Sequence, residues 1–423
     1  MVAFGLIDIN NMFVSCERVF NPSLAGRPVI VLSSNDGCAI ARSNEAKALG
    51  IKMGDPYFKI ASLCEINNVA VLSSNFAIYC DLSTRMMDIL AQHAPSAEQY
   101  SIDECFLDLT GLTGDLTVWC QALRAKVKRW VGLPNSIGTG KSKTLAKLAN
   151  RLAKKSTRAD GVLDLAGHPE WLDRALAKTE IGDVWGIGRA YAAKLAAHNI
   201  TTALQLREAD DGWIKRHLGT PAMKTVLELR GVACHDLETQ PDHRHSCTVS
   251  RSFGHPTGRL DDIREAVVSF AGKAAEKLRA EKLSAGMLTV YAATNRFRHD
   301  QPQNTLSVSA KFYPPQSDAL RIIQAAVSAL TKAWDIGPWE YSSAGILLAD
   351  LVANDAIPRD LFFSAPAETQ SGLMQAVDSL NRRFGRGTAS FGLVPEDAAW
   401  KSRQERKSPD YTSRWSDIPV AEA

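Results

Sequence analysis

Three carboxylates that lie far apart in the sequence have the setting of a shared metal site. Asp8 ends the apolar run of residues 3–10, and Asp103 and Glu104 interrupt a second apolar segment at residues 100–109. Such runs are typical of buried central strands, where a charge is costly unless a partner such as a divalent cation neutralises it. Carboxylate and backbone oxygens suit Mg²⁺, and two ions about 3.5–4 Å apart can support in-line displacement at phosphorus. The three residues therefore indicate a two-metal site for that reaction.

The strands that carry these carboxylates must bring them to one place. Asp103 and Glu104 are neighbours, so on a regular strand they would point to opposite faces. We therefore expect them at the tip of a hairpin, with Cys105, Leu107 and Leu109 alternating inward on the return strand. The alternative for an isolated Asp-Glu pair is a solvated turn; the buried strands on both sides and the matching Asp8 favour the site.

The composition is that of a globular protein with more than one domain. The chain has 423 residues, 45% of them hydrophobic and 22% charged, which allows two to four domains. No apolar run is long enough to predict a membrane span, and the apolar N-terminus lacks a basic leader, so it indicates a strand and not a signal peptide. Eight cysteines at irregular spacing indicate reduced thiols in a cytoplasmic protein.

The order of predicted elements indicates a multidomain α/β (α+β) protein. A mixed region to about residue 164 precedes a helix-rich region over residues 168–237 and a linker at 241–245. A third unit over residues 247–352 has the order β-α-β-β-α-β of a split βαβ sandwich. Its predicted elements are a strand at 247–253, a helix at 260–282, strands at 287–293 and 305–312, a helix at 318–334 and a strand at 341–351. After Asn354 we expect a weakly ordered or partner-dependent tail.

A basic helix is expected to begin near Ser142. Between residues 141 and 158 no acidic residue occurs, and one helix face carries Lys143, Lys147, Arg151 and Lys154. Such a face is often only solvated, but without acidic partners it also suits phosphates or a DNA backbone. The preceding Gly-Thr-Gly-Lys-Ser is no P-loop, because the glycine required five residues before Gly140 is Asn135.

Two further patterns admit a functional and a structural interpretation. Gly186 and Gly188, followed by Arg189, fit a helix-hairpin-helix turn that holds a phosphate, or ordinary helix capping. Phe13 follows Asp8 by five residues and fits core packing or a floor beneath the sugar of a nucleotide, where its bulk excludes a 2′-hydroxyl. Spacing alone favours the core for Phe13.

Taken together, the motifs resemble those of Y-family translesion DNA polymerases, and of the UmuC branch within that family. Asp8 with Phe13, the segment Ser101–Glu104, the basic helix and the Gly186–Gly188 turn occur in the family order and spacing. Further segments similar to the UmuC branch are residues 35–38, 44–50, 183–189, 250–254, 385–388 and 408–414. The resemblance covers nearly the whole chain.

The resemblance implies a right-hand architecture and a set of site residues. It implies a palm over residues 1–166 with fingers inserted at about 12–78, a thumb over 167–240, a little finger over 243–352 and a partner-binding tail over 353–423.

Asp8, Asp103 and Glu104 would be the catalytic metal carboxylates for two Mg²⁺ ions, with the Ile9 carbonyl as a backbone ligand. Phe13 falls on the steric gate, and Lys154 on the lysine that contacts the triphosphate. Asn44 and Lys47 stand where many relatives carry Tyr and Arg, and Asn10 replaces an Asp of several relatives. DNA contacts are expected at Lys143, Lys147, Arg151, Gly186, Gly188, Arg189 and Arg251.

The resemblance also implies partners and a reaction. Primer–template DNA, a deoxynucleotide, a UmuD′-like dimer, RecA and the sliding clamp are expected, with Leu361 and Phe362 as clamp anchors although Pro358 replaces the motif's glutamine. The implied activity is error-prone, template-directed DNA synthesis past damaged bases in the SOS response. A non-catalytic DNA-binding scaffold is disfavoured by the intact carboxylates, and a two-metal nucleotide cyclase by the helix-hairpin-helix and the C-terminal βαββαβ unit.

Overall fold

The computed structural model describes residues 2–239, 244–357, 368–385, 387–392, 398 and 400–420, which form two units. The first unit contains Met1–Ser33, Gly37–Pro241 and Arg406–Ala423, and the second contains Ser34–Asp36 and Asp242–Glu405. Within the described ranges, no helix has the length and apolar character needed to cross a membrane.

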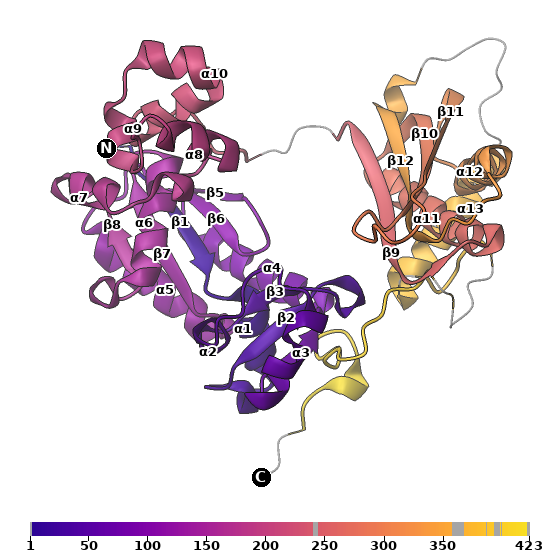
Figure 1. The fold of residues 1–423 in the computed structure, drawn as a ribbon, viewed down its shortest axis with the longest axis horizontal. Helices are drawn as coiled ribbons and strands as arrows, with labels where there is room; N and C mark the ends of the chain where they lie inside the picture. The colour runs from indigo at the N-terminus through magenta and orange to yellow at the C-terminus, as the bar shows by residue number, and fades with distance from the viewer. Residues whose placement is uncertain are drawn as a thin grey trace. The chain divides into compact units, whose positions relative to one another are not determined.

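A mixed sheet forms the centre of the first unit (Figure 1). Its middle strand β1 (Phe4–Ile9) runs antiparallel to both neighbours and is buried on both faces, as its unbroken apolar sequence requires. Ile7 and Ile9 pack with the helices α4 (Phe76–His93) and α5 (Leu116–Val131), whereas Phe4 and Leu6 pack toward α6 (Lys143–Lys155). The other strands are β5 (Ser96–Gln99), β6 (Glu104–Asp108), β7 (Asn135–Gly140) and β8 (Val162–Asp164), in the order β5-β6-β1-β7-β8.

A smaller sheet and a set of helices complete the first unit. The small sheet has the order β3-β2-β4, and one of its faces joins the core of the central sheet through Val29 and Val31. Its elements are β2 (Val29–Leu32), β3 (Ala39–Arg42), β4 (Ala70–Ser73), α1 (Met12–Phe20), α2 (Asn44–Ala48) and α3 (Tyr57–Ile66). The helix-rich region comprises α7 (Leu172–Ala177), α8 (Arg189–Ala196), α9 (Ala203–Glu208) and α10 (Asp211–Leu229) around a core of its own.

The second unit has the predicted order strand, helix, strand, strand, helix, strand. Its antiparallel sheet runs β11-β10-β12-β9, with helices packed on one face, so alternate strand residues such as Leu288 and Val290 are buried. The elements are β9 (Ser246–Thr257), α11 (Leu260–Ala280), β10 (Leu283–Thr294), β11 (Thr305–Gln316), α12 (Ala319–Ala333) and β12 (Tyr341–Ala353). The predicted order is confirmed, although all four strands extend beyond the predicted bounds.

The C-terminal tail is more ordered than the sequence suggests. Helix α13 (Glu368–Phe384) belongs to the second unit, where Met374 and Trp400 are buried in the core and Asp378 forms an ion pair with Arg279 at 2.7 Å. The last described residues, 406–420, belong to the first unit. Buried apolar residues such as Met374 and Trp400 are few and far apart in this polar segment, so its composition alone predicts a weakly ordered tail.

Candidate active site

Asp8 and Glu104 face each other across two central strands. They are directly opposite in the antiparallel pair of β1 and β6, so both side chains leave the same face of the sheet. That face also carries Phe4, Leu6 and Phe106 and is covered by α6. Because side chains alternate along a strand, both carboxylates lie on the face that α6 covers, at the edge of the buried apolar side chains of that face.

Asp103 lies in the turn before β6, as expected for a hairpin tip. Strands β5 and β6 form the antiparallel pair on either side of the turn, and Cys105, Leu107 and Leu109 are buried on the return strand. The Ser101 hydroxyl donates to Asp103 Oδ1 at 2.6 Å, and the Asp103 carbonyl accepts from the Ile9 N–H at 3.0 Å. Among the described residues, no group of three or more His, Cys, Asp or Glu side chains has a metal-binding arrangement. The three-carboxylate cluster stays a prediction.

The basic face of α6 is fully paired, so the expectation that it lacks acidic partners is wrong. The partners come from distant segments that the local sequence does not show. The ion pairs are Lys143–Glu98 at 2.5 Å, Lys147–Glu104 at 3.0 Å, Arg151–Asp183, and Lys154–Asp8 at 2.5 Å. Two of the four cations thus neutralise the two carboxylates of the facing strands.

Burial and neighbouring charges give Asp8 an unusual acidity. Burial raises its pKa from 3.8 to about 6, Lys154 opposes that shift, and the charges of Glu104 and Asp103 add to it. Two further carboxylates thus lie within electrostatic reach of Asp8. Burial is the largest cause of the shift, and a cation bound beside Asp8 would favour its charged form and so lower its pKa.

Lys147 is held by aromatic rings as well as by Glu104. Its ammonium lies 4.2 Å from the ring centre of Tyr100 and 5.5 Å from that of Trp185, within the range of cation–π attraction. Trp185 Nε1 donates to the Tyr100 hydroxyl at 3.3 Å. These contacts fix Lys147 between the helix-rich region and the hairpin that bears Glu104.

Lys143 is buried and ion-paired, not exposed to solvent. It is 3% exposed, and its ammonium contacts Glu98 and donates to the Asp236 carbonyl at 2.6 Å. Glu98 also accepts from the Glu238 N–H at 2.8 Å. Lys143 therefore ties the end of the helix-rich region to β5, and its burial argues against a direct DNA contact.

Replacing Lys143 by Met is expected to lower the free energy of unfolding by about 3–5 kcal/mol, because it leaves the Glu98 carboxylate buried without its cation. Denaturant unfolding of the full chain measures this. Lys155→Met is the matched control, since the Lys155 side chain is 67% exposed, and it should change stability by less than about 0.5 kcal/mol. Equal stabilities of the two variants would show that the buried pair is no structural tie.

A second set of polar side chains extends from α1 to the small sheet. Lys47 donates to Asn11 Oδ1 at 2.6 Å, and Asn11 donates to Asn44 Oδ1 at 3.2 Å. Burial lowers the pKa of Lys47, and the charges of Arg42 and Lys154 lower it further. Arg42 and Lys154 therefore lie within electrostatic reach of Lys47, and Lys154 also contacts Asp8, an environment that suits a polyanion such as a triphosphate.

Phe13 lies in an aromatic cluster on the first turn of α1. Its ring stacks on Tyr79 with centroids 4.5 Å apart and an interplanar angle of 11°, and Phe76 meets it edge-on at 5.5 Å. Tyr79 is fully buried, whereas Phe13 is half-buried. Phe13 thus has one face on the core and a part that remains exposed, and its role as a steric gate stays a prediction.

The glycines that resemble a P-loop serve helix packing. A Cβ at Gly138 would lie 2.0 Å from the Asn150 nitrogen, and one at Gly140 would lie 2.5 Å from the Leu145 Cβ. Only glycine permits so close an approach of β7 and α6. This packing explains the two glycines without a P-loop.

The Gly186–Gly188 turn has the geometry of a helix start. Gly186 has a φ of 89°, and Gly188 is the N-cap of α8 with no side-chain cap. Arg189 begins the helix and is exposed, as are both glycines. The first turn of α8 therefore offers backbone N–H groups and one cation to an anion.

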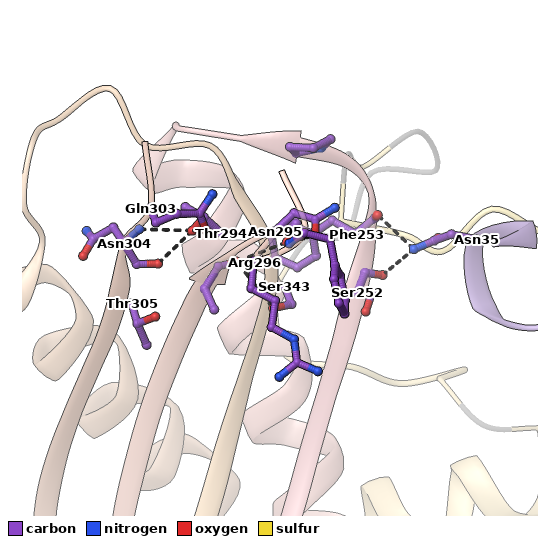
Figure 2. A pocket seen from close by; sticks show the side chains of 14 residues that line it. Asn35, Ser252, Phe253, Thr294, Asn295, Arg296, Gln303, Asn304, Thr305 and Ser343 are labelled. Carbon is purple, nitrogen blue, oxygen red and sulfur yellow. Dashed lines mark hydrogen bonds between the residues drawn. The ribbon is translucent and has the colours of Figure 1, made fainter. Parts of the chain in front are cut away.

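In the second unit, polar residues surround a pocket of about 840 Å³ at one end of the sheet (Figure 2). Thr294, Asn295 and Arg296 line it from the end of β10, and Ser252 and Phe253 from β9. Its described lining includes amides, hydroxyls and one guanidinium but no carboxylate, thiol or imidazole, which indicates binding rather than a reaction centre. Arg251, the predicted DNA contact, is exposed on β9 next to this lining.

The predicted clamp anchors Leu361 and Phe362 lie outside the described residues. The sequence did not single out three residues that contact or influence the predicted site residues: Asn11 accepts from Lys47, Tyr79 stacks on Phe13, and the charge of Arg42 reaches Lys47. Asn11 has a φ of 51°, a conformation that Asn tolerates better than most residues. Tyr79 belongs to an apolar helical stripe, which by pattern alone indicates only core.

Comparisons with known proteins agree on one family. Residues 7–151 match the impB/mucB/samB family, residues 244–361 its C-terminal domain, and residues 371–421 a domain of unknown function, DUF4113. The chain is 41% identical to Protein UmuC of Salmonella typhimurium over 98% of this chain and 99% of the relative. It is 39% identical to Protein MucB of Escherichia coli, over 99% of each chain. DNA polymerase IV 2 of Mesorhizobium japonicum is 27% identical over 93% of this chain.

Solved structures show the same fold. A Y-family DNA polymerase chimera of Dbh and Dpo4 matches 83% of this chain and all of its own, with a TM-score of 0.66 and 21% identity. An insertion ternary complex of Dbh DNA polymerase matches the same shares with a TM-score of 0.55. The mixed helix and sheet architecture is therefore that of the Y-family polymerases.

Proposed function

Because the chain belongs to the impB/mucB/samB family and is a translesion DNA polymerase of the UmuC type, we propose that its reaction centre is the face where Asp8 and Glu104 meet α6. The observation that carries this proposal is the register of Asp8 opposite Glu104, with Asp103 in the adjoining turn. A non-catalytic scaffold and a nucleotide cyclase are not favoured, since the matched relatives include DNA polymerases.

The donor set fits divalent cations. Asp8, Glu104 and Asp103 would hold them, with the Ile9 carbonyl as a backbone ligand, and a bound cation would oppose the effect of burial, which raises the pKa of Asp8. Two Mg²⁺ ions, when bound, would supply charge stabilisation at the attacking and leaving oxygens of the primer 3′-hydroxyl reaction with the α-phosphate. Lys147 and Lys154 form ion pairs with Glu104 and Asp8.

The chain's own cations would orient the triphosphate. Lys154 and Lys47 lie close enough to repel each other, with Asn44 and Asn11 linked to Lys47. Such charges would hold the phosphates, and Phe13, on α1, would contact the incoming sugar. We assign the palm to residues 1–166 with fingers at about 12–78, the thumb to 167–240 and the little finger to 243–352.

Replacing Lys47 by Ala is expected to raise the KM for a deoxynucleotide by about tenfold or more with a smaller change in kcat, because a charge-assisted hydrogen bond of about 1.5–3 kcal/mol is lost. Steady-state incorporation of a single nucleotide measures this. Lys52→Ala is the control, since Lys52 is exposed and its side chain should leave KM unchanged. A parental KM for Lys47→Ala would remove Lys47 from the phosphate site.

DNA contacts form a further part of the proposal. The exposed turn at Gly186–Arg189 and exposed Arg251 support contacts with the phosphate backbone, which carry no sequence information. Arg151 and Lys147 are ion-paired, so they would contact DNA only by exchanging partners. A cytoplasmic location is also proposed, supported by an activity on DNA.

Partners and activity are tested together. Primer extension past an abasic template site by the purified chain tests the proposed reaction centre, with an Asp8→Asn variant as the comparison. Adding a UmuD′-like dimer, a RecA filament or a sliding clamp to the same assay tests each proposed partner separately. Extension that is equal for the parent and the Asp8→Asn variant would overturn the assignment of the centre.

A further inference from the structure

The C-terminal segment of residues 406–411 runs along the small sheet of the first unit (Figure 1). The Ser73 N–H donates to the Arg406 carbonyl at 3.0 Å, the Arg406 N–H donates to Ser73 Oγ at 2.9 Å, and Lys407 forms a parallel bridge with Ser73. Asn75, at the N-terminus of α4, donates to the Ser408 carbonyl at 3.1 Å and to the Pro409 carbonyl at 3.3 Å. The segment is thus held at the junction of β4 and α4.

Ser408 reaches a buried carboxylate that the proposed chemistry does not use. Its hydroxyl donates to Glu17 Oε1 at 3.1 Å, and the Tyr79 hydroxyl donates to the same oxygen at 2.7 Å. Glu17 is 1% exposed. Burial raises the pKa of Glu17, and the hydrogen bonds from Tyr79 and Ser408 oppose that shift. The two hydroxyl groups therefore stabilise a carboxylate that water hardly reaches.

The same contacts continue to Phe13. Glu17 lies one helical turn after Phe13 on α1, and Tyr79 spans the two, with its ring stacked on Phe13 and its hydroxyl on Glu17. Tyr411 stacks on Phe20 of the same helix with centroids 4.9 Å apart. Ser408, Glu17, Tyr79 and Phe13 therefore form a continuous series of contacts from the C-terminal segment to the proposed sugar gate.

We propose that residues 406–411 support the sugar gate, with Ser408 as a positioning residue that fixes Tyr79 through Glu17 and thereby fixes the Phe13 ring. This rests on the proposed function, in which Phe13 contacts the incoming sugar. It also gives a role to part of the 371–421 match, a domain of unknown function. The C-terminal segment would then influence which nucleotide is accepted without touching it.

The effect follows from the tolerance of a steric gate. A bulky ring excludes a 2′-hydroxyl only if it stays within about half an ångström of its position. Without the Ser408 hydroxyl, Glu17 keeps one side-chain donor, and the Tyr79 hydroxyl loses a fixed acceptor. The Tyr79 ring can then shift beneath Phe13, so ribonucleotides gain access while deoxynucleotides, which need no exclusion, are affected less.

The test measures kcat/KM for a deoxynucleotide and for its ribonucleotide counterpart on the full chain. Ser408→Ala is expected to lower the ratio of the two by about three- to tenfold, and Ser408→Thr, which keeps the hydroxyl, to restore most of it. Ser413→Ala is the matched control, because Ser413 is an exposed serine two residues after the segment. A purely structural role would lower both efficiencies together and leave their ratio at the parental value.

A second variant and a reference variant make the outcomes separable. Tyr79→Phe removes the other donor to Glu17 and should lower the ratio as Ser408→Ala does, with the double variant showing less than the sum of the two effects. Phe13→Ala reports on the gate itself. A parental ratio in both Ser408→Ala and Tyr79→Phe, together with a lost ratio in Phe13→Ala, would overturn the proposed support and leave the gate intact. A parental ratio in Phe13→Ala would instead overturn the gate assignment and the support with it.

Discussion

Replacing Asp8 by Asn is expected to lower the rate of primer extension by on the order of a thousandfold. The amide keeps the shape of the side chain but removes the charge, and metal-assisted charge stabilisation contributes several kcal/mol, at about 1.4 kcal/mol per factor of ten. Asp103→Asn should have an effect of the same order if its carboxylate joins that of Asp8 when cations bind. Single-turnover nucleotide incorporation on a primed template measures both.

The control for these variants lies on β6, the strand that follows Asp103. Asp108 is at the far end of β6 and accepts a hydrogen bond from the Thr110 N–H at 2.8 Å, so Asp108→Asn should extend primers at the parental rate. DNA affinity, measured by fluorescence anisotropy, should change little in the Asp8 and Asp103 variants. Near-parental extension by Asp103→Asn alone would confine the metal-binding role to Asp8 and Glu104.

The strand rules predicted the paired carboxylates. The apolar flanks predict Asp8 at the end of a buried strand and Asp103 with Glu104 at a hairpin tip, and the structure places Asp8 opposite Glu104. The hairpin tip at Asp103 and the element order of the second unit followed from equally local patterns. Each of these features depends on residues within one strand or one turn, where sequence spacing translates directly into side-chain direction.

Contacts between distant segments could not be predicted in the same way. The acidic partners of α6 include Glu98 and Asp183, which lie far from residues 141–158 in the sequence. Counting charges within residues 141–158 therefore predicts that the basic helix has no acidic partners. In the structure, every cation on its predicted face forms an ion pair. The family resemblance named Lys147 as a DNA contact, but it does not show that Tyr100 and Trp185 enclose its ammonium.

The order of the C-terminal segment also depends on contacts with distant residues, which composition does not predict. Ser408 and Tyr411 stand in a polar sequence with no periodic apolar stripe, so composition predicts a loose tail. Their partners Glu17 and Phe20 come from the other end of the chain. A segment of this kind is ordered by a few specific contacts instead of by a hydrophobic face, and such contacts leave no mark in composition.

Replacing Phe13 by Ala is expected to lower discrimination against ribonucleotides by on the order of a hundredfold. Forcing extra volume into a packed site costs about 1–3 kcal/mol, which corresponds to roughly five- to 160-fold in relative efficiency. The half-buried ring, fixed from below by Tyr79 and from the side by Phe76, has little room to move away from a 2′-hydroxyl. The ratio of kcat/KM for deoxy- and ribonucleotides measures the effect. Phe58→Ala is the control, because Phe58 is 78% exposed on α3 and should leave the ratio unchanged. If Phe13→Ala loses stability but keeps the parental ratio, the ring serves the core and another group selects the sugar.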